Sequence, residues 1–164
     1  MSQLPTVYIS VGGNINPRLH IKNALQKLKA DFGTTTVSSV YESKSVGFEG
    51  DNFLNLVVSF QSTLSVGLLN QYLHDIEDAE GRERLNGKAW DSRTLDLDIV
   101  LYGNEIGTVE GVELPRDEIL EHAHVLLPLA EIAGTLVHEP TQKTYRELQK
   151  GIDFSQQEIW TVQL

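Results

Sequence analysis

The 164-residue sequence contains no cysteine, which excludes disulfide bonds, thiolate metal sites, iron–sulfur clusters and cysteine nucleophiles. It also lacks any apolar run near the length of about 18 residues that a membrane-spanning helix needs. Positive charge is scarce, because 13 Lys and Arg residues stand against 23 Asp and Glu residues, for a formal net charge of −10. Nucleic acids and anionic membrane surfaces attract cationic patches, so we expect neither as a partner. No basic segment precedes the first apolar stretch, so we expect no signal peptide and a cytoplasmic protein.

The sequence has no internal repeat and no linker-like tract, so we expect a single domain over residues 1–164. Apolar periodicity predicts a strand at 7–11 that closes at a Gly-Gly-Asn turn, and then a helix capped by Asn16 that ends at Gly33. Strands follow at 35–42 and 53–62, a helix runs from Ser65 to about Gly81, and another strand covers 95–102. This β-α-β-β-α-β order is typical of a ferredoxin-like α+β fold, with an antiparallel sheet, helices on one face and the other face free for ligands. A short strand near Val112, a helix over about 122–133 and a C-terminal extension with a helix near 144–150 complete the prediction.

The strand at 95–102 places two acidic residues on one face. Its predicted buried face carries Leu95, Leu97, Ile99 and Leu101. Asp96 and Asp98 point the opposite way, about 6–7 Å apart at the rise of a strand. Two carboxylates this close repel each other, and Mg²⁺ suits the position because it takes oxygen ligands from one or two carboxylates and from substrate phosphates. The same alternation also fits an ordinary amphipathic strand, and the spacing alone leaves both interpretations open.

Residues 82–93, which precede this strand, hold four cationic and two acidic side chains in an otherwise acidic chain. Arginine binds phosphate oxygens in a bidentate manner, so this segment favours a site for metal-chelated polyphosphate. Glycines at 81 and 87 would allow the segment to move over the phosphates. A solvated basic loop is the alternative interpretation. The sequence has no P-loop and no G-x-G-x-x-G motif, so arginines and metal would have to hold any ATP.

The strand at 53–62 offers a second set of candidates. Leu54, Leu56, Val58 and Phe60 are expected to face the core, which places Phe53 and Asn55 on the other side. A flat heteroaromatic ring can stack on an aromatic side chain and be read at its edge by an amide. Phe53 could equally be covered by a loop, and Trp90 is either a second stacking surface or an anchor for the basic segment. The ten-residue connection at 43–52 is longer than a hairpin needs, which is typical of a binding loop.

The string Arg93-Thr94-Leu95-Asp96-Leu97-Asp98-Ile99, preceded by Gly81-Arg82-x-Arg84 and Trp90, resembles the signature of the 6-hydroxymethyl-7,8-dihydropterin pyrophosphokinase family of folate synthesis. Similar blocks occur in the same order at residues 8–14, 37–41, 53–55, 103–104 and 127–133. The resemblance implies an enzyme that transfers pyrophosphate from ATP to the hydroxymethyl group of 6-hydroxymethyl-7,8-dihydropterin and releases AMP.

The resemblance also implies a role for individual residues. Asp96 and Asp98 would hold two Mg²⁺ ions, and Arg82 and Arg93 would neutralise charge on the transferred group. The implied nucleotide contacts are Glu77, Arg84, Arg93 and Ile99. The implied pterin contacts are Ser43, Val46, Gly47, Phe53, Asn55 and Trp90. The expected partners are the small-molecule substrates ATP and the pterin, and the sequence shows no obligate protein partner.

The sequence departs from the family pattern in one region. Arg116 and Asp117 replace a His-Pro pair, His122 replaces an arginine that contacts ATP phosphates, and His124 replaces a phenylalanine that stacks on the pterin. Because a histidine is fully charged only below its pKa, near 6.5, phosphate binding at His122 should weaken. Arg116 is the candidate to replace that cation, while His124 can still stack. These changes leave two alternatives open: a divergent paralogue with another pterin-like acceptor, or a non-catalytic module that binds nucleotide or pterin.

Overall fold

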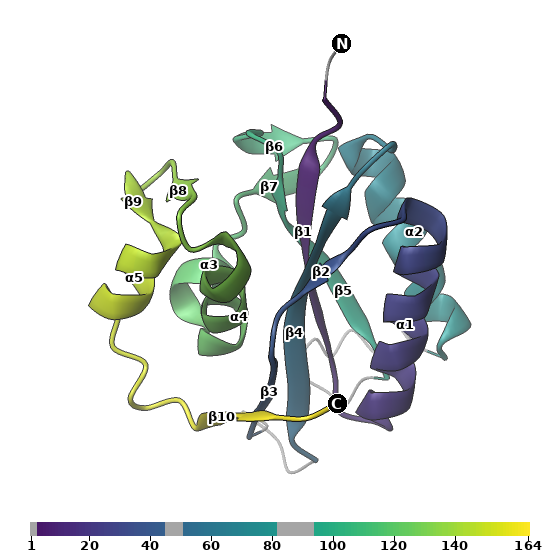
Figure 1. The fold of residues 1–164 in the computed structure, drawn as a ribbon, viewed down its shortest axis with the longest axis horizontal. Helices are drawn as coiled ribbons and strands as arrows, with labels where there is room; N and C mark the ends of the chain where they lie inside the picture. The colour runs from purple at the N-terminus through teal and green to yellow at the C-terminus, as the bar shows by residue number, and fades with distance from the viewer. Residues whose placement is uncertain (1–2, 45–50, 82–93) are drawn as a thin grey trace.

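A computed structural model describes residues 3–44, 51–81 and 94–164 of the chain. Its main sheet has the strand order β10-β3-β4-β1-β5, with β2 paired to β4, and every pairing is antiparallel (Figure 1). The strands of this sheet are β1 (Thr6–Gly13), β2 (Thr36–Val37), β3 (Val40–Ser43), β4 (Phe53–Gln61), β5 (Asp96–Tyr102) and β10 (Ile159–Val162). The helices are α1 (Pro17–Phe32), α2 (Val66–Ala79), α3 (Glu118–Glu121), α4 (Ala123–Ala133) and α5 (Tyr145–Gly151). The predicted antiparallel α+β class is confirmed.

Two small hairpins lie outside the main sheet. One pairs β6 (Gly107–Val109) with β7 (Val112–Leu114), and the other pairs β8 (Val137–His138) with β9 (Lys143–Thr144). Within the described residues, no helix is both long and apolar enough to cross a membrane.

Helices α1 and α2 pack on one face of the sheet and form the first core. Each contributes an apolar stripe at helical spacing, so that Ile21 and Leu28 of α1 and Leu69 and Leu73 of α2 are fully buried. The opposing strand residues include Val7, Ile9, Val11, Leu54, Leu56, Val58 and Phe60. The alternation predicted for the strand at 53–62 is therefore confirmed.

The second face of the sheet is also covered, so the expectation of helices on one face and a free second face was wrong. Helix α4 packs on β4 and β3, and α5 packs on α4 (Figure 1). Val57 of β4 meets Leu126 and Leu129 of α4 and Tyr145 of α5 in a separate buried cluster. The physical reason is composition, because α4 is apolar on most of its surface and buries seven of its eleven residues.

Strand β5 stays paired with β1, but its register with that strand shifts partway along its length. Ile9 of β1 pairs with Ile99 and Tyr8 pairs with Leu101, so the register with β1 shifts across Val100. A bulge of this kind reverses the alternation of side chains beyond it. Leu101 consequently lies in the second cluster, together with Val100, and the prediction that it shares the first core with Ile99 was wrong.

The ends of the first elements also differ from expectation. The glycines at 12 and 13 belong to β1 and do not form the predicted closing turn. Asn16 occupies the N-cap of α1 in a left-handed conformation, with φ of 46°, and its side chain makes no capping hydrogen bond. At α2, by contrast, the Ser65 hydroxyl accepts a hydrogen bond from the Leu68 amide, as an N-cap serine should.

The predicted strand at 35–42 is divided into β2 and β3 by a side-chain bond at Ser38. The backbone N–H of Ser38 donates to the carbonyl of Val57, and its hydroxyl accepts from the buried N–H of Val57, both at 2.9 Å. Next to it, the Glu131 carboxylate of α4 accepts from the amide and hydroxyl of Ser39 and from the Tyr41 hydroxyl, at 2.7–3.0 Å. These bonds attach α4 to the strands of the second face.

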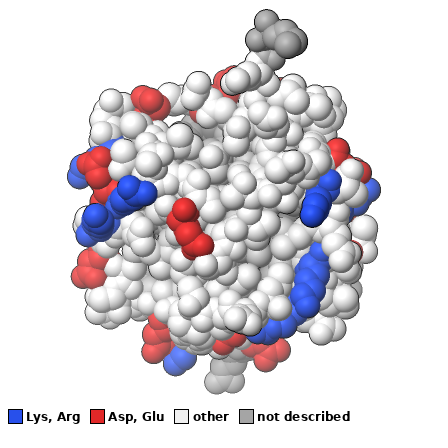
Figure 2. All heavy atoms as spheres, viewed as in Figure 1, with Lys and Arg blue, Asp and Glu red and all other residues white. Residues whose placement is uncertain are grey.

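On the face shown in Figure 2, charged side chains lie mainly toward the margins, with an acidic group nearer the centre. The described residues on this face form no continuous basic patch.

Candidate functional site

Four residues form a row across one end of the sheet. Tyr41 pairs with Asn55, Asn55 pairs with Gly12, and Gly12 pairs with Asp96, so the row crosses β3, β4, β1 and β5. Directly paired residues on neighbouring strands lie on the same face of a sheet. The amide predicted to read a pterin and the carboxylate predicted to hold metal therefore lie on one face, with only a glycine between them.

Asp96 and Asp98 lie on this face, at the start of β5, as the alternation of the strand predicts. Both are partly exposed, and the Asp98 side chain retains 46% of its accessible surface. Burial, together with the negative charge of Asp96, raises the pKa of Asp98 to about 7. The folded protein thus penalises a second negative charge at this position, which is the electrostatic setting that a bound cation would relieve.

Arg116 lies beside this acidic pair. Its Nη2 is 3.5 Å from Oδ1 of Asp98, its Nε donates to the carbonyl of Ile99 at 3.0 Å, and its backbone N–H donates to the carbonyl of Val100 at 3.2 Å. The guanidinium is therefore held against β5 by the backbone as well as by charge. The Ile99 side chain itself is fully buried in the first core.

Glu77 of α2 supports the same strand from the opposite face. Its carboxylate accepts a hydrogen bond of 2.7 Å from the Leu97 amide, and its side chain is 1% exposed. The bond fixes the backbone between the two aspartates. The nucleotide contact predicted for Glu77 stays a prediction, and its observed role is to position β5.

His122 and His124 stack on each other at the start of α4, with ring centroids 5.0 Å apart and planes 19° from parallel. His122 is extended, between α3 and α4, so it is not the ordinary helix residue that the sequence predicts. Burial lowers the pKa of His124 to about 4, and the neighbouring His122 acts in the same direction. Asp96 acts weakly in the opposite direction, which places this pair within electrostatic reach of the acidic end of β5.

The described pterin candidates gather at the junction of β3 and β4. Ser43 pairs with Phe53 at the ends of these strands, next to the row that contains Asn55. Phe53 is partly buried and Asn55 is 8% exposed. Their direct contacts with a ligand remain predictions. Val46, Gly47, Arg82, Arg84, Trp90 and Arg93 lie outside the described residues.

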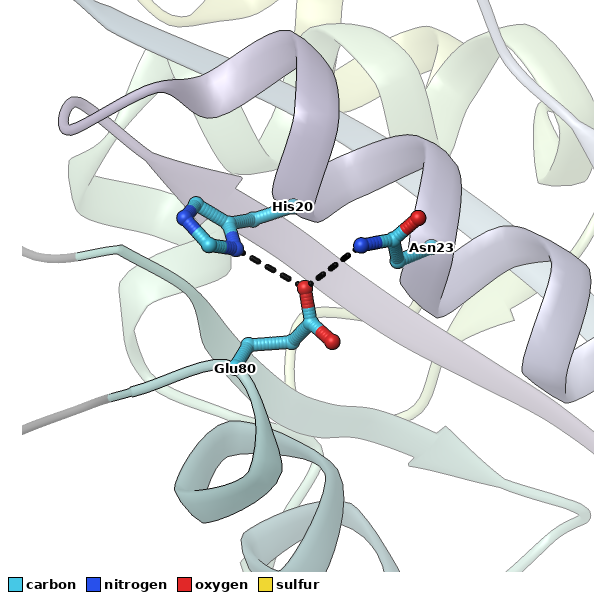
Figure 3. Close-up of polar contacts among 3 residues, drawn as sticks. All are labelled: His20, Asn23 and Glu80. Atoms are coloured by element: carbon cyan, nitrogen blue, oxygen red, sulfur yellow. Dashed lines mark hydrogen bonds and ion pairs between the residues drawn. The ribbon is translucent and has the colours of Figure 1, made fainter.

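Sequence reasoning missed a polar cluster that joins α1 to the end of α2 (Figure 3). His20 and Asn23 of α1 point toward Glu80, whose Oε1 lies 2.8 Å from Nδ1 of His20 and 3.0 Å from Nδ2 of Asn23. Glu80 is the C-cap residue of α2 and directly precedes Gly81, where the arginine-rich sequence begins. The i, i+3 spacing of His20 and Asn23 was the available signal, but their partner is 57 residues away in sequence.

Paired carboxylates beside an arginine at one end of an antiparallel sheet have the chemistry needed to bind a metal-chelated phosphate group. The family model for 7,8-dihydro-6-hydroxymethylpterin-pyrophosphokinase (HPPK) matches residues 8–134, and the chain belongs to this family. It is 38% identical over 149 residues to the 2-amino-4-hydroxy-6-hydroxymethyldihydropteridine pyrophosphokinase of Haemophilus influenzae, covering 88% of this chain and 91% of that protein. It is 36% identical over 138 residues to the Bacillus subtilis protein of the same name, covering 82% and 81% of the two chains.

The fold is similar to solved structures of HPPK-DHPS proteins. The crystal structure of HPPK-DHPS in complex with substrates has a TM-score of 0.69 and 12% identity, and the match covers 91% of this chain and 43% of that chain. The Plasmodium falciparum HPPK-DHPS with pterin and p-hydroxybenzoate has a TM-score of 0.67 over 92% of this chain and 43% of its own. This chain thus matches less than half of those longer proteins, and at this identity the comparison shows the fold alone.

Proposed function

We propose that this chain transfers pyrophosphate from ATP to the hydroxymethyl group of 6-hydroxymethyl-7,8-dihydropterin and releases AMP. Membership of the HPPK family supports this reaction. The single structural observation that carries it is the shared row, in which Asn55 and Asp96 flank Gly12 on one face. An acceptor bound at the amide would present its reactive arm to a phosphate chain bound at the acidic end.

Asp96 and Asp98 fit a Mg²⁺ site by their chemistry. Both supply oxygen ligands from one face of a strand, and the raised pKa of Asp98 shows that burial and its acidic neighbour disfavour an uncompensated charge. Mg²⁺ commonly takes one or two carboxylates and completes its shell with water and phosphate oxygens. Bound there, the two ions that the resemblance implies would neutralise phosphate charge, and Glu77 would keep the carboxylates in place by fixing the Leu97 amide.

The side chains around this pair act on the phosphates mainly by charge and position. Arg116 is the described cation nearest to Asp98, and its backbone-anchored guanidinium can contact a phosphate oxygen in place of Asp98. His122 would add a hydrogen-bond donor to the phosphates. We assign the remaining charge compensation to Arg82, Arg84 and Arg93, with Trp90 closing over the substrates, as the resemblance implies. Little covalent chemistry is required, because phosphoryl transfer depends on alignment and electrostatic stabilisation.

The acceptor would lie between Asn55, Phe53 and His124. Its ring edge would meet the Asn55 amide, which offers both a donor and an acceptor. His124 stays uncharged at pH 7 because burial lowers its pKa to about 4, so it presents a flat neutral ring to a pterin. A neutral histidine at position 124 can therefore take the stacking role of the phenylalanine that is typical of the family. The substrates are small molecules, and the cytoplasmic location stays a prediction.

The test is product analysis after incubation of the purified chain with ATP, Mg²⁺ and 6-hydroxymethyl-7,8-dihydropterin. We expect AMP and the pterin pyrophosphate in equal amounts, and neither product when EDTA removes the metal. Formation of ADP would contradict pyrophosphate transfer. Tight binding of both substrates without turnover would instead support the non-catalytic alternative.

A further inference from the structure

Gly12 is the only residue between the amide of Asn55 and the carboxylate of Asp96 in their row. A Cβ atom built at Gly12 would lie 2.2 Å from Nδ2 of Asn55, 3.1 Å from its Cγ and 3.3 Å from the carbonyl oxygen of Leu54. The first of these distances is far inside van der Waals contact. The Asn55 amide therefore occupies the space where any side chain at position 12 would begin.

The glycine is required here for space and not for backbone conformation. Gly12 lies within the regular part of β1 and is absent from the glycines of the described residues that have a positive φ. Any L-residue could adopt its extended backbone. What no other residue could do is leave the Asn55 amide in its observed place.

The closeness of the Asn55 amide to Gly12 shows in which direction the Asn55 side chain points. Neighbouring strands are about 4.8 Å apart, so the Cα atoms of Asn55 and Asp96 are separated by roughly 10 Å across β1. Since Nδ2 of Asn55 lies over Gly12, the amide extends along the row toward β5. Asn55 is 8% exposed, so a displaced amide could not simply turn into solvent without losing its packing.

We propose that Gly12 is a positioning residue that sets acceptor specificity, because it lets the Asn55 amide reach across β1 and hold the acceptor ring in line with the acidic pair. This inference rests on the proposed function and adds to it the feature that aligns the two substrates. A side chain at position 12 displaces the amide by more than an ångström, which breaks the paired hydrogen bonds at the ring edge. The phosphate end of the site, held by Asp96, Asp98 and Arg116, keeps its own geometry.

The experiment compares Gly12→Ala with the wild-type chain by calorimetric binding of the pterin and of an ATP analogue, each with Mg²⁺ present. We expect the pterin dissociation constant to rise at least tenfold while that of the nucleotide changes less than threefold. In turnover, the KM for pterin should rise in the same proportion. Gly151→Ala is the matched control, because nothing lies within 4 Å of a Cβ at that position and its backbone is not left-handed.

A double-mutant cycle separates this role from a general packing defect. Asn55→Ala removes the collision, so adding Gly12→Ala to it should weaken pterin binding less than twofold further. If Gly12→Ala alone fails to fold, the double variant should fold, since the displaced group is gone.

The inference would be overturned by unchanged pterin binding in Gly12→Ala, by equal losses for both ligands, or by a further large loss in the double variant. An unfolded double variant would also overturn it. A wild-type chain that binds pterin but forms no AMP removes the proposed reaction and leaves the positioning role to be decided by the same binding data. A wild-type chain that binds no pterin removes both.

Discussion

Replacing Asp98 with asparagine should stabilise the protein at neutral and alkaline pH while abolishing its activity. The change keeps the shape of the side chain and removes a negative charge that burial and Asp96 make unfavourable, as the raised pKa of about 7 shows. A carboxyl whose folded pKa is raised destabilises the fold where it must ionise. The advantage of Asp98→Asn should therefore be absent below pH 4, grow between pH 4 and 7, and stay constant above pH 7.

The structure sets the size of this effect. Moving a carboxyl pKa from its ordinary value near 4 to about 7 corresponds to roughly 4 kcal/mol at full strength. Because the Asp98 side chain is 46% exposed, solvent screening reduces this to about 2 kcal/mol. The attraction of Arg116, 3.5 Å away, is already included in this value, because it acts to lower the pKa of Asp98. The expected gain of about 2 kcal/mol raises Tm by about 4–8 °C for a chain of this size.

Thermal unfolding of wild type and Asp98→Asn at pH 4 and pH 8, with and without Mg²⁺, measures the effect. Mg²⁺ should raise the Tm of the wild type more than that of the variant, because ligands stabilise the state that binds them. Asp75→Asn, on the exposed surface of α2, provides a matched control that should show neither change. A variant that is less stable than wild type at pH 8, or equally stabilised at both pH values, would refute the electrostatic account of the acidic pair.

Two further predictions concern the scaffold. Ser38→Ala leaves the buried Val57 amide without its hydroxyl acceptor, so the variant should lose about 1–3 kcal/mol of stability, and an unchanged Tm would argue against that bond. Glu80→Gln should destabilise the protein at pH 7: although burial acts in the opposite direction, hydrogen bonds from His20 and Asn23 lower the pKa of Glu80. That stabilisation disappears as the wild-type carboxyl protonates, so the Tm difference should shrink as the pH falls below about 4, and a constant difference would exclude the linkage.

Much of the first core could be predicted because its signals are local. The period of two in β4 and the helical stripes of α1 and α2 each specify a buried face without reference to distant residues. The second core could not be predicted in the same way. Helix α4 is apolar on most sides, so its sequence predicts that it is buried but does not indicate which surface it packs against. Ile99, Val100 and Leu101 are all apolar, and nothing in such a run indicates where the alternation is interrupted.

The candidate site also contains some residues that a local pattern predicts and others that only the tertiary structure brings together. Asp96 and Asp98 were predicted from the alternation of one strand. The collision that Gly12 avoids depends on the register of β1 with β4. The contact of Arg116 with Asp98 depends on the segment after β7, which returns to β5. The stacking of His122 on His124 depends on the exact start of α4, and helix ends are the least certain feature of a sequence-based assignment.

The irregularity at Val100 divides β5 into two parts that serve different layers. Leu97 and Ile99 pack in the layer of α1 and α2, whereas Val100 and Leu101 pack in the cluster that contains α4. Without this extra residue, Leu101 would follow Ile99 directly and still pair with Tyr8, so the later side chains of the strand would keep their faces and the aspartates would stay in place. The packing of Val100 and Leu101 against the second layer can therefore be changed without altering the register in which Asp96 and Asp98 pair with β1.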